Sequence, residues 1–132
     1  MSKVPKKPAK SRSQELAELL ARTAHAQRGE HIRVLAVGPL VYITDFFVLV
    51  TTKSARQTRA MADALNAAAK EHGFHKGRVE GQYQSPWLLA DFGMVVVHVL
   101  TDEARGFYAL DQLWADAEEI DLEFGAADGS GS

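Results

Sequence analysis

Cysteine is absent from all 132 residues of the chain. Disulfide bonds, thiolate catalysis and cysteine-based zinc sites are therefore excluded, and the composition is compatible with a cytoplasmic protein. Long apolar runs are also missing, because the longest, residues 94–100, contains His98 and is far too short to cross a bilayer. The sequence has no phosphate-binding loop, dinucleotide-binding fingerprint or G-x-S-x-G elbow. These absences argue against several large enzyme classes, and no cofactor is expected.

Acidic side chains are missing from residues 1–12, which carry Lys3, Lys6, Lys7, Lys10 and Arg12. The whole chain has 15 Lys and Arg against 17 Asp and Glu, so the remaining residues have ten basic against 17 acidic side chains. An acidic body argues against broad binding to a nucleic-acid backbone. We expect residues 1–12 to form a disordered basic arm, which could instead contact RNA near a docking site.

Apolar periodicity and capping residues predict one domain at residues 13–116. The expected elements are a helix beginning near Ser11 or Ser13, strands at 32–37 and 46–51, a helix at 55–72, strands at 78–81, 87–91 and 94–100, and a helix at 102–110. Ser54 and Gln57 have capping-box spacing, and Gly73 is a left-handed stop. The acidic segment 117–132 is expected to be a disordered tail.

The element order αββαβββα predicts an α/β fold, with a mixed five-stranded sheet and flanking helices. Residues 46–51 and 94–100 are largely apolar on both faces, which indicates strands in the centre of the sheet. The strand–helix–strand unit from residue 46 to residue 81 should form a right-handed parallel crossover.

Side chains suited to catalysis or metal binding are scattered. His72 and His75 are three residues apart, but the helix stop between them removes the shared face that a metal site needs. Asp45, Asp91 and Asp102 occur singly at three element ends, whereas a nucleotidyl-transfer enzyme needs two or three carboxylates around magnesium. We therefore expect no catalytic residues and no metal site, and a binding protein rather than an enzyme.

The hairpin at residues 87–100 is the strongest candidate for a docking surface. Trp87 begins its first strand, and Leu88 and Leu89 must point to opposite faces of that strand. An exposed Trp–Leu patch rimmed by acids is typical of the centre of a protein interface. Packing in the core is the alternative for Trp87, and Tyr83 could extend the patch.

His98 lies in the middle of an apolar strand. An unpaired polar group in a core is costly, so one interpretation is a buried, neutral and hydrogen-bonded imidazole. The other interpretation is a role at a docking surface.

Six segments occur in an order and spacing that resemble a known family. They are TDFFVL at 44–49, the helix at 54–72, RVEG at 78–81, WLLADFG at 87–93, VVVHV at 95–99 and EARGFYALDQLW at 103–114. Together they resemble the Iojap family, which comprises the bacterial ribosomal silencing factor RsfS and its organellar relatives. The resemblance covers residues 15–115.

This resemblance implies a nucleotidyltransferase-like fold that has lost its catalytic carboxylates. It implies binding to the large ribosomal subunit through ribosomal protein L-fourteen, which would block joining of the small subunit and repress translation when nutrients are scarce. It also implies a homodimer in the free state. No membrane contact and no sequence-specific binding to nucleic acid are expected.

The docking residues that the resemblance implies lie in and around the first strand of the hairpin. They are Trp87, Leu88, Leu89, Asp91, Phe92 and Gly93, extended by Glu80, Tyr83 and His98. The chain departs from the family at Met94, where many relatives have an acid, and at residues 51–53, where relatives often have a glycine-bearing loop. Two other functions stay open, a nucleotidyltransferase-type enzyme and an RNA-binding module that uses the basic arm.

Overall fold

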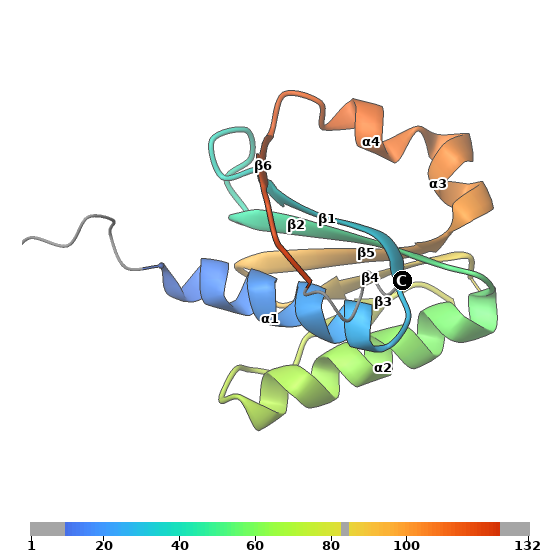
Figure 1. Cartoon of the computed structure of the whole chain (residues 1–132), viewed down its shortest axis with the longest axis horizontal. Helices are drawn as coiled ribbons and strands as arrows, with labels where there is room; N and C mark the ends of the chain where they lie inside the picture. Colours follow the sequence, from blue (N-terminus) through green and yellow to red (C-terminus); the bar gives the residue numbers. More distant parts are fainter. Residues whose placement is uncertain (1–9, 83–84, 125–132) are drawn as a thin grey trace, which may run out of the picture.

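The fold is a six-stranded mixed sheet between two unequal layers of helices, as the computed structural model shows for residues 10–82 and 85–124 (Figure 1). The strand order across the sheet is β3-β4-β5-β2-β1-β6. The elements are α1 (Arg12–Ala26), β1 (Glu30–Ala36), β2 (Phe46–Thr52), α2 (Ala55–Glu71), β3 (Arg78–Glu80), β4 (Trp87–Asp91), β5 (Val95–Thr101), α3 (Asp102–Tyr108), α4 (Leu110–Leu113) and β6 (Glu118–Ile120). The predicted α/β class is confirmed, with one strand more than the five expected.

The central strands are β2 and β5, as their apolar sequences predict. They pair in parallel from Phe46 opposite Val95 to Thr52 opposite Thr101, and every residue of β2 is buried. The strand β4 pairs antiparallel with β5, and β3 pairs antiparallel with β4. Consequently β3 runs in the same direction as β2, as the predicted crossover requires, although β5 and β4 separate the two strands.

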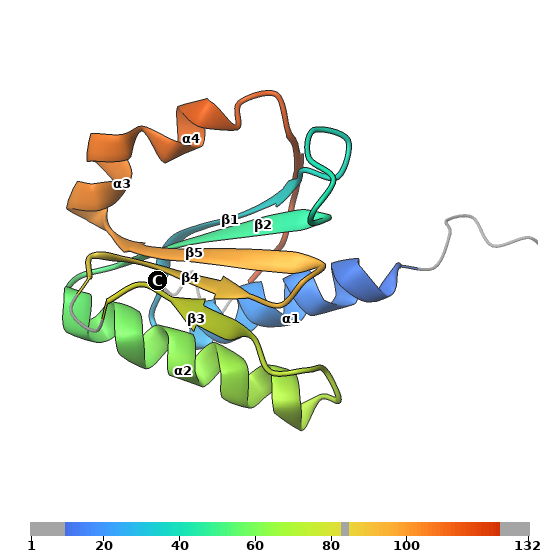
Figure 2. The same cartoon turned by 180° about the vertical axis from the view of Figure 1, so that it is seen from behind.

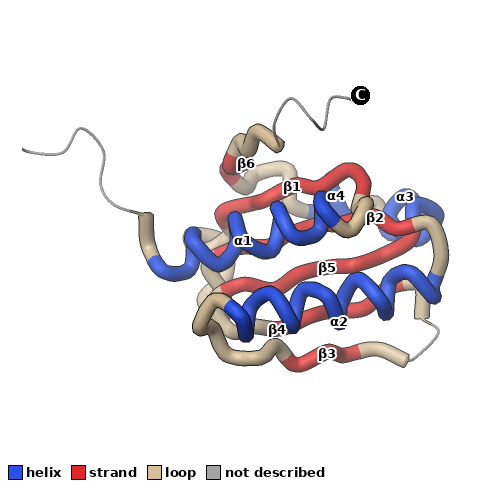
Figure 3. The backbone as a smooth tube through the Cα atoms, turned by 60° about the horizontal axis from the view of Figure 1, so that its bottom comes forward, coloured by secondary structure: helices blue, strands red, loops and turns tan. Residues whose placement is uncertain are grey.

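The long helices α1 and α2 lie side by side across one face of the sheet (Figure 3). Each begins at a serine whose hydroxyl accepts a backbone hydrogen bond three residues later, at 3.1 Å from Ser11 to Gln14 and from Ser54 to Gln57. Gly73, with φ of +84°, follows the end of α2 and reverses the chain as expected. The core on this face combines side chains from the helices and the sheet, including Leu16, Leu20, Val48, Met61, Leu65, Val97 and Val99.

The short helices α3 and α4 lie on the opposite face (Figure 2). They bury a smaller apolar cluster that includes Phe47 and Leu49 of β2, Leu100 of β5 and Leu110 of α4. A single helix was predicted at residues 102–110, but Ala109 has φ of +50° and divides the segment into two helices. No helix within the two described ranges is long and apolar enough to cross a membrane.

The prediction of a disordered tail at residues 117–132 is wrong for residues 118–124. The strand β6 pairs antiparallel with β1, with Ile120 opposite Val34. Ile120, Leu122 and Phe124 pack against the larger core. The acids of this segment suggested a solvated tail, but apolar residues alternate with them and so place one side of the segment on the core. Residues 125–132 lie outside the described residues.

The predicted basic arm falls mostly on residues 1–9, which also lie outside the described residues. The described part begins with an ion pair of 2.6 Å between Lys10 and Glu18. Arg12 is the first residue of α1, and its guanidinium lies 4.1 Å from the ring centre of Phe74. The boundary of the domain is therefore slightly earlier than predicted.

Candidate docking surface

Alternate side chains of β4 point to opposite faces of the sheet. Leu88 and Ala90 have no exposed surface and belong to the side that α1 and α2 cover. Trp87, Leu89 and Asp91 are partly exposed on the side of α3. The prediction that one of the two leucines would be in the core is confirmed. Leu88 is the buried one, so its inclusion among the docking residues is wrong.

Trp87 belongs to a row of aromatic side chains that runs from α3 across strands β4, β5 and β2 of the sheet. Ring centres lie 4.8 Å apart between Trp87 and Tyr108 of α3, and 4.9 Å apart between Tyr108 and Phe107. On its other side Trp87 approaches His98, whose ring meets Phe47 edge to face at 4.7 Å. Phe107 is 80% exposed and Tyr108 is 51% exposed, so the row ends in an open apolar surface.

The exposed part of this row was not predicted. The sequence shows Phe107 and Tyr108 only as two adjacent aromatics on a short helix, and their contact with Trp87 depends on how α3 folds back over the sheet. Monomeric proteins rarely expose large contiguous apolar patches, and such patches often mark interaction sites. We define the β4–α3 patch as Trp87, Leu89, Phe107 and Tyr108.

His98 lies beneath this patch rather than on it, and is only 8% exposed. The indole Nε1 of Trp87 donates a hydrogen bond to its Nδ1 at 3.3 Å. Its Nε2 is buried and has no hydrogen-bond partner within the described part of the chain. Burial lowers the pKa of His98 to about 4, so the imidazole is neutral at pH 7. The predicted buried, neutral histidine is confirmed, and direct contact with a partner is not expected.

Asp91 stabilises the turn between β4 and β5 through a local hydrogen bond. Its Oδ1 accepts a hydrogen bond of 2.8 Å from the backbone N–H of Gly93, which is exposed and has φ of +86°. The ring of Phe92 packs against the larger core and against Gly77, where an added Cβ would lie 2.7 Å from the ring. Phe92 therefore faces away from the β4–α3 patch, contrary to its predicted role. Met94 is 37% exposed at this turn.

The strand β3 provides the rim of the patch. Glu80 is exposed and lies opposite Leu89, and Arg78 lies opposite Asp91. Residues directly opposite each other in a sheet present their side chains on the same face. Glu80 and Asp91, two of the predicted docking residues, therefore lie on the same face of the sheet as the patch, beside the basic side chain of Arg78. Tyr83, the remaining predicted residue, lies outside the described residues.

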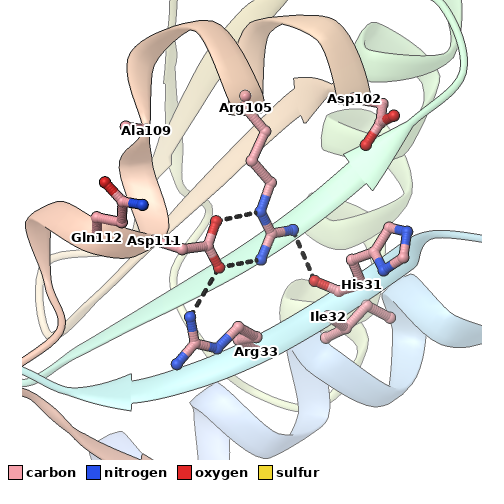
Figure 4. A pocket seen from close by; sticks show the side chains of 9 residues that line it. His31, Ile32, Arg33, Asp102, Arg105, Ala109, Asp111 and Gln112 are labelled. Carbon is pink, nitrogen blue, oxygen red and sulfur yellow. Dashed lines mark hydrogen bonds and ion pairs between the residues drawn. The ribbon is translucent and has the colours of Figure 1, made fainter.

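A cluster of ion pairs holds the two helices α3 and α4 in place on either side of the break at Ala109 (Figure 4). Arg105 is 8% exposed and donates to both carboxylate oxygens of Asp111, at 2.7 and 2.8 Å. It also donates to the backbone oxygen of His31 and to the hydroxyl of Thr51. Arg33 of β1 donates to the same carboxylate at 2.7 Å. These arginines hold the pKa of Asp111 well below its ordinary value.

A hollow of about 640 Å³ adjoins this cluster, lined by His31, Ile32, Arg33, Asp102, Arg105, Gly106, Ala109, Asp111 and Gln112. Its guanidinium and carboxylate groups bond mainly to one another, so the cluster positions α3 and α4 instead of offering free ligands. The described residues contain no group of three or more His, Cys, Asp or Glu side chains that could hold a metal ion. Asp45 and Asp91 flank the start of β5, whereas Asp102 follows its other end.

The fold and the surface together define an α/β protein with an exposed apolar patch of the kind found at protein interfaces. Residues 10–131 match the family described as "Ribosomal silencing factor during starvation". The ribosomal silencing factor RsfS of Halalkalibacterium halodurans is 36% identical over 111 residues, which cover 84% of this chain and 95% of the relative. The chloroplastic protein Iojap of Zea mays is 35% identical over 105 residues, which cover 80% of this chain and 46% of the relative.

The fold is shared with a crystal structure of a Chromobacterium violaceum protein. The TM-score is 0.74 at 30% identity, and the match covers 89% of this chain and 97% of the other. The chain therefore belongs to the ribosomal silencing factor (RsfS/Iojap) family, as the order of its sequence motifs indicated.

Proposed function

We propose that the chain is a non-enzymatic, cytoplasmic repressor of translation that binds ribosomal protein L-fourteen on the large ribosomal subunit. When bound there, the protein blocks joining of the small subunit. It represses translation in this way when nutrients are limited. The β4–α3 patch is the observation that carries this proposal, because it is apolar, exposed and bordered by acids. Membership of a ribosomal silencing family and the sequence resemblance support the choice of partner.

The patch has the features that a protein interface needs. Trp87 and Leu89 supply apolar anchors, and Tyr108 and Phe107 extend them onto α3. Glu80 on the rim suits a basic partner, since complementary charges speed association and disfavour wrong partners. An interface of standard size buries about 1,600 Å² in total. Micromolar affinity, about −8 kcal/mol, is within the range of such an interface.

Steric exclusion requires no bond to be made or broken. A protein that occupies the face of the large subunit that meets the small subunit prevents joining by its presence alone. Asp102 lies at the opposite end of β5 from Asp45 and Asp91, and Asp91 bonds within its own turn, which agrees with a mechanism that uses no group of catalytic carboxylates. The strength of repression therefore depends on the affinity of the protein for the large subunit and on how long it stays bound.

A subunit-joining assay tests the proposal directly. Purified small and large subunits are mixed with the protein, and assembled ribosomes are separated by sucrose-gradient centrifugation. We expect the protein to reduce the fraction of assembled ribosomes and to sediment with isolated large subunits. An unchanged assembled fraction at saturating protein would contradict the proposed repression.

The variant Trp87→Ala tests whether the β4–α3 patch is the surface that binds the large subunit. Loss of a central aromatic anchor should weaken binding to large subunits by about 2 kcal/mol, or about 30-fold. Phe74→Ala is the matched control, because Phe74 is also a partly buried aromatic but packs at the end of α2 against Arg12. We expect Phe74→Ala to lower stability and to leave co-sedimentation unchanged. Equal binding by both variants would remove Trp87 from the interface.

The free protein is proposed to be a homodimer, as the resemblance implies. Sedimentation equilibrium over a range of concentrations measures this directly. A concentration-independent monomer would contradict this part of the proposal.

A further inference from the structure

The buried imidazole beneath the β4–α3 patch has a role that packing alone does not explain. We propose that His98 is a positioning residue, whose Nδ1 accepts the Trp87 indole N–H and fixes that indole in the orientation that docks on the partner. This inference rests on the proposed function, since it assumes that Trp87 is an anchor of the interface.

The geometry places His98 where it can control Trp87. The two residues lie on neighbouring strands, and the indole Nε1 is 3.3 Å from the imidazole Nδ1. The position of the imidazole is itself restricted by its neighbours. Its ring contacts Phe47 edge to face, and Leu89 lies opposite it on β4. The indole of this partly exposed tryptophan, on the strand next to the sheet edge, is thus bonded to a nearly buried side chain.

The protonation state of His98 suits this role. A neutral imidazole that accepts a hydrogen bond at Nδ1 carries its proton on Nε2. That Nε2 is buried without a hydrogen-bond partner in residues 10–82 and 85–124. A leucine of similar size would avoid this unpaired donor, so packing alone favours an apolar residue here. Accepting the indole proton is the contribution that leucine lacks.

Preorganisation explains why this matters for binding. A tryptophan that is fixed before binding loses less rotamer entropy when it enters the interface. Without the hydrogen bond, the indole can also turn its N–H toward water. If the hydrogen bond favours the docking orientation by about 1 kcal/mol, its loss lowers the population of that orientation in the free protein and weakens binding about fivefold.

Two variants separate positioning from packing. His98→Leu keeps the approximate volume and removes the acceptor, whereas His98→Asn places an amide oxygen close to the position of Nδ1. We expect His98→Leu to unfold at the same or a higher urea concentration than the wild type, yet to bind isolated large subunits about fivefold more weakly. If the role of His98 were purely structural, any loss of binding in His98→Leu would be accompanied by a loss of stability. His98→Asn should restore most of the binding.

A spectroscopic measurement on the free protein tests the contact without a ribosome. The indole N–H of Trp87 gives one of two indole signals in a ¹H–¹⁵N correlation spectrum, and Trp114→Phe assigns it. We expect this proton to exchange with water more rapidly and to shift in His98→Leu, and to remain protected in His98→Asn. Should His98→Leu not fold, His98→Phe serves as the variant without an acceptor.

The outcomes are distinguishable from those of the proposed function. An unchanged indole signal in His98→Leu overturns the positioning role, whatever the ribosome assay shows. Wild-type binding by His98→Leu, alongside weak binding by Trp87→Ala, overturns it as well. Wild-type binding by Trp87→Ala instead overturns the docking surface, and the positioning role falls with it.

Discussion

Arg105 and Asp111 form a two-point ion pair across the break between α3 and α4, six residues apart in the chain. Ala109, with φ of +50°, lies between them and turns the chain so that their side chains meet. Arg33 ties the same carboxylate to β1, at 2.7 Å. The pair therefore fixes the orientation of α3, and with it the position of Tyr108 beside Trp87.

Replacing Asp111 by Asn should lower the free energy of unfolding by about 2 kcal/mol at pH 7, because a nearly buried guanidinium loses its counter-charge. The arginines depress the pKa of Asp111, so this contribution is present above about pH 4 and is lost as the pH falls below it. Urea unfolding at pH 7 and pH 3 measures both effects. Asp63→Asn, which breaks an exposed pair with Arg59, should change stability by less than about 0.5 kcal/mol.

Substitution of two glycines by alanine should have opposite effects. Gly81 follows β3 with φ of +125°, and an added Cβ would lie 2.5 Å from the Leu88 side chain. Gly81→Ala should therefore lower the free energy of unfolding by about 2 kcal/mol or more. Gly106 lies within α3 with open space around it, and Gly106→Ala should stabilise by about 0.5–1 kcal/mol. Thermal unfolding of the two variants checks the opposite signs.

Much of the fold could be predicted because local signals and the global structure agree. The apolar character of β2 and β5 on both faces reflects their place between other strands and two layers of helices. Ser54 begins α2 through a hydrogen bond that the sequence spacing indicates. The alternation of Leu88 and Leu89 follows from strand geometry alone, but which leucine is buried depends on the layer that each face meets.

The unpredicted features depend on contacts between distant parts of the chain. The strand β6 exists because Ile120 reaches the core and Glu119 pairs with Arg33, 86 residues earlier. The extension of the patch to Tyr108 likewise depends on the turn at Ala109 and on its contact with Trp87. The turn at Ala109 produces no pattern that local periodicity can detect. The alternation of Ile120, Leu122 and Phe124 is such a pattern, but the acidic composition of the segment outweighed it in the prediction.

The strand β6 should contribute measurably to stability. Ile120 pairs opposite Val34 and packs against the larger core, so Ile120→Ala should cost about 1–2 kcal/mol. Leu113→Ala is the matched control, since Leu113 is 68% exposed and should change stability by less than about 0.5 kcal/mol. Equal urea midpoints for the two variants would show that β6 adds nothing to stability.

His98 should make the protein lose stability in mildly acidic solution. Burial lowers its pKa from 6.5 to about 4, so the unfolded chain takes up the proton first. The fold therefore keeps its full stability above about pH 6.5 and loses stability progressively as the pH falls from 6.5 to about 4, by a total of about 3 kcal/mol. Urea unfolding between pH 7 and pH 4 should show this slope, and His98→Leu should flatten it. An equal slope in both proteins would assign the acid sensitivity to other groups.

Charge reversal at Asp91 distinguishes an electrostatic role from a role in the turn. Asp91→Lys should slow association with large subunits about tenfold at low salt, and less at higher salt, if the acid faces a basic partner. Asp63→Lys makes the same change in net charge on α2 and should leave association nearly unchanged. Asp91→Asn keeps an oxygen that can accept the Gly93 N–H, so it should retain the turn and lose only the charge effect. Stopped-flow association at several salt concentrations separates the variants. Equal slowing by Asp91→Lys and Asp63→Lys would leave Asp91 as a turn residue alone.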